Sequence, residues 1–315
     1  MQEFAEINAN GAVVICGGES MLDVEDYFSV TKECIRLGLQ CFSVINGTKV
    51  RTEGMADRMI REGPSEITLS INSYKPEIHD LTRGVKGNFD QVVKAMGLLI
   101  DSRNRLNVRK PIYAMAVVCE QNYRDLDRFY DFILNDVGAD KLKLNFLQPS
   151  FGLPKWRPVD RFFKENVVSD YEALASMIRK CDRVYRLRIN PAWLEHVKMY
   201  HRSIKENRNA AMGWLHRNGT REPICNSYDR NIMVNLYGNA GLCFNSTFPS
   251  IPLKARGDLT RFWYERSLPI REKMTKCTRY CGISHSVRRE HATLTTRENE
   301  PVMQDRSLAE QHRQL

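Results

Sequence analysis

Short apolar segments alternate with longer amphipathic segments along the first half of the chain. The apolar segments are typical of strands and cover 12–16, 40–45, 66–72, 112–119 and 141–147. Between them, apolar residues recur at helical spacing in 24–37, in 55–61 and in the stretches after Asn88 and Asn122. This order predicts right-handed parallel β-α units, arranged as an open doubly wound sheet or as a barrel.

Two of the predicted strands alternate between apolar and polar residues. Thr68, Ser70 and Asn72 alternate with apolar neighbours, as do Lys143 and Asn145. If the apolar sides meet the helices, the polar sides face inward and line a ligand-binding barrel. An exposed face of an open sheet explains the same pattern, and the two interpretations both stay open.

The alternation of short apolar and longer amphipathic segments ends after residue 150, and we divide the chain at that point. Residues 1–150 are expected to form the α/β unit, and 151–220 a basic helical connection with helices at 171–185 and 191–207. Residues 221–285 are expected to form a small domain, with a hairpin of strands 231–237 and 242–244 around a turn at 238–241. Short helices are expected at 259–265 and 270–274, and 286–315 is a polar tail.

Composition narrows the class of protein. Hydrophobic residues make up 42% of the 315 residues and charged residues 27%, which excludes a disordered or fibrous chain. No apolar run approaches the ~18 residues that a membrane-spanning helix needs. Met1 to Gly11 carries neither the basic flank nor the apolar core of a signal peptide, so we expect a cytoplasmic protein. Thiols stay reduced there, and the nine cysteines then need another explanation than disulfides.

The net charge of +9 is concentrated in one stretch. Residues 151–221 hold fifteen Lys or Arg against seven Asp or Glu, a net of +8. A solvated helical surface explains this excess. The alternative is a basic rim that faces an anionic partner, such as a phosphorylated metabolite, an acidic peptide or a nucleic acid.

Four cysteines form a candidate metal site near the C-terminal end. Cys225 and Cys243 are spaced C-x12-G-x4-C around Gly238, and Cys277 and Cys281 are spaced C-x3-C. Four thiolates suit tetrahedral zinc or an iron–sulfur cluster. Neither pair has the C-x2-C spacing of a zinc ribbon. Four unrelated buried cysteines are the remaining alternative.

Two further motifs follow predicted strands. Gly17-Gly18-Glu19 follows the first strand, where glycines let a backbone approach a ligand and a carboxylate can accept hydrogen bonds from an ammonium group. A tight strand-to-helix turn needs the same residues. His79-Asp80, with Arg83-Gly84 and Gly87, follows the third strand and forms either a glycine-shaped loop with a surface ion pair or a loop over a barrel mouth.

Over residues 1–285 the chain resembles a radical S-adenosylmethionine (SAM) enzyme with a C-terminal auxiliary-cluster domain of the twitch or SPASM type. The motifs that carry the resemblance are Gly17-Gly18-Glu19, Ser70-Ile71-Asn72, His79-Asp80-Leu81-Thr82-Arg83-Gly84, Leu147-Gln148-Pro149 and the Cys225–Cys243 spacing with the later cysteines. The resemblance implies a partial parallel (β/α) barrel of the radical SAM type, N-terminally truncated, and a small hairpin-and-helix iron–sulfur domain.

The resemblance also implies roles for individual residues. Gly17, Gly18 and Glu19 would contact the methionyl amino group of SAM, and Ser70 and Asn72 its ribose and carboxylate. Leu147 and Gln148 would flank the adenine. Cys225, Cys243, Cys277 and Cys281 would hold an auxiliary 4Fe-4S cluster. Ser20 stands where the family usually has a proline that stiffens the turn.

The chain departs from the family in one essential motif. The family holds its catalytic 4Fe-4S cluster with a C-x3-C-x2-C loop before the Gly-Gly-Glu segment, and no such motif occurs in the 315 residues. Three explanations compete: the chain is a fragment of a longer enzyme, a degenerate homologue, or a chain whose partner supplies the cluster. We favour the fragment, because the rest of the SAM motifs are present.

The expected function is that of a radical SAM enzyme that, in its full-length form, generates a 5′-deoxyadenosyl radical and abstracts hydrogen from a substrate. That substrate is expected to be an anionic small molecule or a peptide, and the electron donor a flavodoxin or ferredoxin. The alternative is a catalytically inactive iron–sulfur or zinc module that docks an anionic partner.

Overall fold

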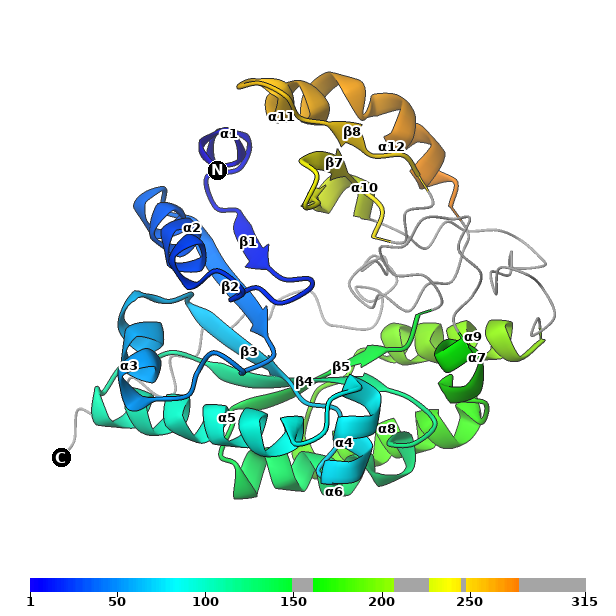
Figure 1. Cartoon of the computed structure of the whole chain (residues 1–315). Coiled ribbons are helices and arrows are strands. Elements are labelled where there is room, and N and C mark those ends of the chain that lie inside the picture. The colour runs from blue at the N-terminus through cyan, green and yellow to red at the C-terminus, as the bar shows by residue number, and fades with distance from the viewer. Residues whose placement is uncertain (149–160, 207–226, 245–247, 278–315) are drawn as a thin grey trace, which may run out of the picture.

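The computed structural model describes residues 1–148, 161–206, 227–244 and 248–277 (Figure 1). Five strands form one parallel sheet in the order β1-β2-β3-β4-β5. They are β1 (Ala12–Ile15), β2 (Gln40–Ile45), β3 (Glu66–Ser70), β4 (Ile112–Val118) and β5 (Lys141–Phe146). Each strand lies beside its neighbour in the sequence, so all five carboxyl ends meet at one edge of the sheet. The prediction of parallel β-α units is confirmed.

Helices cover one face of this sheet, as Figure 1 shows. In chain order they are α2 (Val24–Arg36), α3 (Glu53–Glu62), α4 (Pro76–Arg83), α5 (Asn88–Arg105) and α6 (Leu126–Asp131), with short turns η1 (Tyr123–Asp125) and η2 (Phe132–Asp136) on either side of α6. Side-chain caps fix where α2 and α3 begin. Asp23 accepts from the Asp26 N–H (2.9 Å), and Thr52 accepts from the Met55 N–H (3.3 Å).

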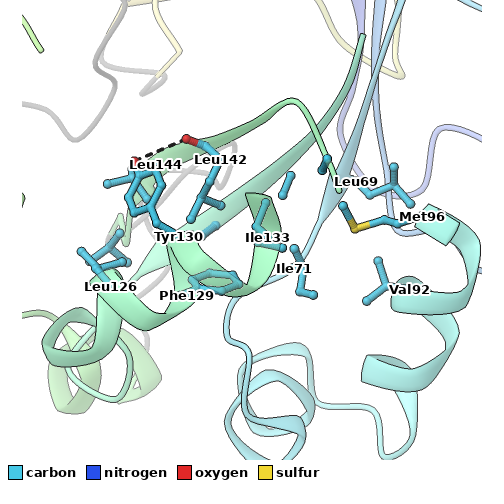
Figure 2. Close-up of a cluster of buried hydrophobic side chains, with 14 of the residues drawn as sticks. Leu69, Ile71, Val92, Met96, Leu126, Phe129, Tyr130, Ile133, Leu142 and Leu144 are labelled. Carbon is cyan, nitrogen blue, oxygen red and sulfur yellow. Dashed lines mark hydrogen bonds between the residues drawn. The ribbon is translucent and has the colours of Figure 1, made fainter. Parts of the chain in front are cut away.

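The core lies between the sheet and these helices. Apolar residues at alternate strand positions, such as Leu69 and Leu144, pack against helix residues such as Met96 and Phe129 (Figure 2). The Tyr130 hydroxyl lies 3.4 Å from the Leu142 carbonyl, so the buried phenol has a backbone acceptor. The other strand positions therefore point to the opposite face of the sheet, which the helices named above do not cover.

Three helices follow the sheet: α7 (Arg161–Asn166), α8 (Tyr171–Tyr185) and α9 (Pro191–Glu206). The buried residues Ile178 and Val197 belong to the same continuous core as the sheet. The two long helices of the region that we predicted as a basic connection are therefore packed onto the α/β unit rather than separated from it.

The remaining described residues form a small second unit. It contains α10 (Ser227–Arg230), α11 (Asp258–Arg261), η3 (Phe262–Arg266) and α12 (Leu268–Thr275), together with a three-stranded antiparallel sheet of β6 (Met233–Val234), β7 (Asn239–Gly241) and β8 (Ile251–Pro252). Its core is separate from the first and is built around Leu242, Phe262 and Met274.

A short N-terminal helix connects the two units. In α1 (Gln2–Ile7), the Glu3 carboxylate accepts hydrogen bonds from the backbone N–H groups of Gly257 (2.8 Å), Leu259 (3.0 Å) and Thr260 (3.1 Å). These bonds hold the pKa of Glu3 below its usual value. Glu3 thus caps α11, and Figure 1 shows α1 beside it. Nothing in the local pattern of the sequence predicted α1 or this contact.

The hairpin prediction was wrong in register. Residues 239–241, which we placed in the turn, form strand β7, and the turn lies at 235–238. The Asn235 side chain accepts from the N–H groups of Tyr237 and Asn239, both at 3.0 Å, and thereby closes the turn earlier. Gly238 has a φ of +71°, which glycine adopts without strain.

Candidate functional site

The candidate site lies at the edge where the strands of the parallel sheet end. Gly17 and Gly18 follow β1, are exposed, and have φ angles of +94° and +53°. These angles lie in the left-handed region that favours glycine. A Cβ at either position would meet no atom within 4 Å. The backbone conformation therefore requires these glycines, and it leaves the loop open to a ligand.

Glu19 is fixed by bonds to two backbone groups. Its Oε1 accepts from the Met21 N–H and its Oε2 from the Asn46 N–H, each at 3.0 Å. The carboxylate therefore ties the loop after β1 to the end of β2. Each carboxylate oxygen has a second lone pair, so the group can still accept a bond from a ligand.

Ser20 strengthens the same turn. Its hydroxyl donates to the Val44 carbonyl at 2.9 Å and also lies 3.4 Å from the Ile15 carbonyl. These contacts join the ends of β1 and β2 at the position where the resembled family usually has proline.

Ser70 and Asn72 differ in what they can offer to a ligand. Ser70 ends β3, is half-buried, and its hydroxyl has no hydrogen-bond partner among the described residues. Asn72 is 4% exposed, and its amide is already in use, with Nδ2 donating to Thr82 Oγ1 (3.0 Å) and Oδ1 accepting from the Val117 N–H (2.9 Å). Ser70 is thus available to a ligand, whereas Asn72 holds the neighbouring segments in place.

The predicted loop at 79–84 is largely a helix, so that expectation was wrong. Residues 76–83 form α4, with Pro76 at its start and Gly84 at φ +67° after its end. His79 Nδ1 accepts from the Asn72 N–H (3.1 Å), so Nε2 carries the proton and donates to Asn88 Oδ1 (3.0 Å). Burial lowers the pKa of His79 and favours this neutral form. Its role is to fix α4 to the end of β3.

Asp80 has a similar structural role and forms no surface ion pair within the described residues. Its carboxylate accepts from the Gly87 N–H and from the Phe89 N–H (2.9 Å). These bonds lower its pKa against the opposing effect of burial. They also connect α4 to the first turn of α5.

Arg83 belongs to a motif that the sequence analysis named, but that analysis gave it no role toward a ligand. It lies in the last turn of α4, and its guanidinium forms no ion pair with any residue that the structure describes. Burial lowers its pKa, while the nearby Glu19 carboxylate acts in the opposite direction. Guanidinium groups stay charged in proteins, so this half-buried cation can bind an anionic ligand group. A basic residue in a last helical turn is ordinary, and the pattern alone gave no reason to assign it an anionic ligand.

Leu147 and Gln148 follow β5 at the far side of the same edge. The Leu147 carbonyl accepts from the Tyr200 hydroxyl of α9 at 2.7 Å, which anchors the chain beyond the strand. Gln148 is half-buried, and its Oε1 is buried without a hydrogen-bond partner among the described residues. A buried amide oxygen left unpaired is costly, so this group favours a bound donor.

The four predicted cluster ligands are only half within the described residues. Cys243 packs beside Leu242 and Phe262, and Cys277 follows α12, where its N–H donates to the Met274 carbonyl (3.0 Å). Cys225 and Cys281 lie outside the described residues. Among the residues that are described, no three His, Cys, Asp or Glu side chains form a metal-binding group. The four-cysteine cluster stays a prediction.

The comparison with protein families identifies the first segment. Residues 1–133 match the model of the radical SAM superfamily. The resemblance stated from the motifs is confirmed for this segment, which matches the radical SAM superfamily. The matched segment contains Gly17-Gly18-Glu19, Ser70 and Arg83.

Curated relatives match a short part of the chain. Two proteins described as AdoMet-dependent heme synthases, from Nitratidesulfovibrio vulgaris and Oleidesulfovibrio alaskensis, are each 31% identical to it over 93 and 97 residues. Each match covers 30% of this chain, but only 25% and 24% of the two relatives. The match therefore spans about a quarter of the length of these relatives.

Solved structures support the fold over more of the chain. The structure of native anSMEcpe with bound AdoMet and Kp18Cys peptide has a TM-score of 0.51 at 14% identity and covers 86% of this chain and 71% of that one. A second, with Cp18Cys peptide, has a TM-score of 0.51 at 16% identity, with 86% and 72% covered. At such identities the similarity shows the fold alone. Within the described residues, no helix is long and apolar enough to cross a membrane.

Proposed function

We propose that this chain binds SAM across the carboxyl ends of β1, β3 and β5. The observation that carries the proposal is a set of polar groups at one edge of the sheet that form no hydrogen bond or ion pair with the described residues. They are the Ser70 hydroxyl, the Arg83 guanidinium and the buried Gln148 Oε1, next to the open Gly17-Gly18 turn. Their chemistry is complementary to SAM, which carries an ammonium, a carboxylate, a ribose and an adenine.

Each group has a definite role in this proposal. The Glu19 carboxylate accepts from the methionyl ammonium, because its position is already fixed by two backbone N–H groups. Arg83 binds the methionyl carboxylate, and Ser70 donates to the carboxylate or the ribose. Gln148 Oε1 accepts from the adenine amino group, and Leu147 packs against the ring. Asn72 positions Ser70 and α4 rather than contacting SAM.

We further propose that the complete protein is a radical SAM enzyme with an unknown substrate. A reduced 4Fe-4S cluster, when present, supplies the electron that cleaves SAM to methionine and a 5′-deoxyadenosyl radical. No C-x3-C-x2-C motif occurs in these 315 residues, and we propose that other residues than these supply the ligands for that cluster. β1 is an edge strand of the sheet that the described residues form, and a further parallel strand with such a loop would pair there.

The C-terminal unit would hold the auxiliary cluster through Cys225, Cys243, Cys277 and Cys281. Four thiolates occupy every iron of a 4Fe-4S cluster, which favours electron transfer or structural support over direct binding of a substrate. A flavodoxin or ferredoxin is the proposed electron donor.

Anaerobic reconstitution tests the proposal. We expect about four irons in this chain and about eight in a form extended upstream in frame, with SAM cleavage in the extended form alone. The variant Cys243→Ser should lower the iron content of both forms by about four, whereas Cys16→Ser, at an exposed cysteine, should leave it unchanged. Zinc in place of iron, or salt-sensitive nucleic-acid binding without SAM cleavage, would favour the inactive docking module instead.

A further inference from the structure

The uncovered face of the parallel sheet is divided into an apolar and a polar half. On β1 and β2 it carries apolar side chains, Val14, Phe42 and Val44 among them. On β3, β4 and β5 the same face carries mainly polar positions: Glu66, Thr68, Ser70, Tyr113, Met115, Val117, Lys141, Lys143 and Asn145. Most of these are half-buried, while the alternate positions of β4 and β5 are buried in the core.

An ion pair is fixed in the polar half of this face. Lys143 Nζ donates to Glu66 Oε1, and it lies 4.5 Å from the ring centroid of Tyr113. The side chains of Lys143 and Glu66 are 29% and 18% exposed, so the pair is neither at the open surface nor sealed in the core. Glu66 also lies within 3.4 Å of the Thr68 hydroxyl. These contacts give the ammonium group of Lys143 a defined position on the uncovered face.

The backbone of Lys143 lies close to the proposed SAM site, while its side chain points away from it toward Glu66. Ser70 is paired in register with Met115, and Met115 with Lys143, so the three residues form one row across neighbouring strands. Strands in a sheet are about 4.8 Å apart, which puts the Lys143 backbone about 10 Å from that of Ser70. The ammonium group itself reaches Glu66 at the start of β3, four residues before Ser70. A molecule that contacts it would therefore extend from a ligand bound at Ser70 toward the starts of the strands.

We propose that Lys143 binds a carboxylate group of the substrate on this face, with Glu66 holding the ammonium in position. This inference rests on the proposed function, since it assumes that SAM occupies the strand ends. A lysine ammonium has three N–H donors, and Glu66 Oε1 accepts one of them, which leaves donors for a second acceptor. Four ionisable residues occupy the uncovered face of the five strands: Lys141, Lys143, Glu66 and Tyr113. With two lysines and one glutamate, the net charge of these strand positions is positive.

Ligand-observed NMR of the full 315-residue chain tests this, with glutarate as a carboxylate probe and glutaramide as its neutral counterpart. We expect saturation transfer from the protein to glutarate and none to glutaramide. The variant Lys143→Met should lower the affinity for glutarate at least tenfold. The matched control Lys141→Met removes the same charge from an exposed position two residues away and should leave the affinity within twofold.

A second variant separates binding from folding. Glu66→Gln keeps an oxygen acceptor for Lys143 but removes the carboxylate that competes with the probe, so glutarate should bind as tightly or more tightly. Equal loss in Lys143→Met and Lys141→Met, or equal binding of glutarate and glutaramide, would overturn the proposal.

A failure of the Lys143 proposal can be distinguished from a failure of the proposed SAM site. Calorimetry with SAM on the same proteins should give an affinity for Lys143→Met within twofold of the wild type. If SAM does not bind while glutarate still depends on Lys143, the SAM site is wrong and the carboxylate contact stands. If SAM binds and the affinity for glutarate does not depend on Lys143, the SAM site stands and the carboxylate contact is wrong.

Discussion

Replacing Glu19 with glutamine separates the two roles of its carboxylate. Both oxygens accept backbone N–H groups, from Met21 and Asn46, so the side chain fixes the loop as well as facing the proposed ligand. Alanine would remove both acceptors and mix a folding effect with a binding effect. Glutamine keeps one acceptor oxygen and removes the negative charge, so the loop loses one bond and the ligand loses its charged partner.

The two effects differ in size. Loss of one backbone hydrogen bond at a half-buried position costs about 1 kcal/mol of the free energy of unfolding, with more if the new amide N–H₂ faces the N–H left behind. A hydrogen bond from an ammonium group to a carboxylate contributes about 1.5–3 kcal/mol, which corresponds to about a 10- to 150-fold change in the dissociation constant for SAM. Glu19→Gln should therefore weaken SAM binding far more than it destabilises the fold.

Titration calorimetry with SAM and urea unfolding measure the two quantities on the same protein. Glu77→Gln is the matched control, because Glu77 is exposed on α4 and makes no ion pair within the described residues. The reasoning is refuted if Glu19→Gln and Glu77→Gln bind SAM with the same dissociation constant. Equal affinity would leave Glu19 as a loop anchor and nothing more.

Three further predictions concern the framework of the site. Burial lowers the pKa of Lys110, whose ammonium donates to two carbonyls at the end of α3, to about 8. The unfolded chain binds the additional proton between about pH 8 and 10.4, so the free energy of unfolding of the wild type should rise with pH across that window relative to Lys110→Met. The same change with pH in both proteins, measured by urea unfolding, would contradict this. Asn72→Ala leaves a backbone N–H of β4 without its acceptor and should lower the free energy of unfolding in urea by about 1–3 kcal/mol. A loss of SAM affinity with unchanged stability would instead indicate that Asn72 contacts SAM directly. Glu3→Gln weakens the cap on α11, so hydrogen exchange should become faster for the amides of 257–260 and stay unchanged for amides of the parallel sheet. Exchange rates at 257–260 equal to those of the wild type would show that the cap is not needed.

The pattern of the sequence predicted the strands well because each is a short run with its own periodicity. The second strand was predicted with the observed bounds, and the other four with ends that differ by one or two residues. The helix at 76–83 was missed because the motif His79 to Gly84 was treated as a loop, although Pro76 at the start and Gly84 after the end are typical of a short helix.

The candidate site was predictable in part. The family resemblance selected Gly17, Gly18, Glu19 and Ser70, and the structure brings them to one edge because all five strands run parallel. It did not distinguish Ser70, whose hydroxyl has no partner among the described residues, from Asn72, whose amide is bonded on both sides. Which polar groups stay unbonded depends on distant segments, and no local pattern reports that.

The sequence by itself determined the class of fold, the order of its parallel units and the superfamily of its first segment, because periodicity and short motifs are local properties. Only the tertiary structure decided which polar groups are already satisfied and which remain for a ligand. It separated Arg83 from an ordinary basic residue by its burial without an ion pair among the described residues, and it paired Lys143 with Glu66 across 77 positions of sequence. Such pairings follow from strand register and helix packing, which bring together residues that are far apart in the chain.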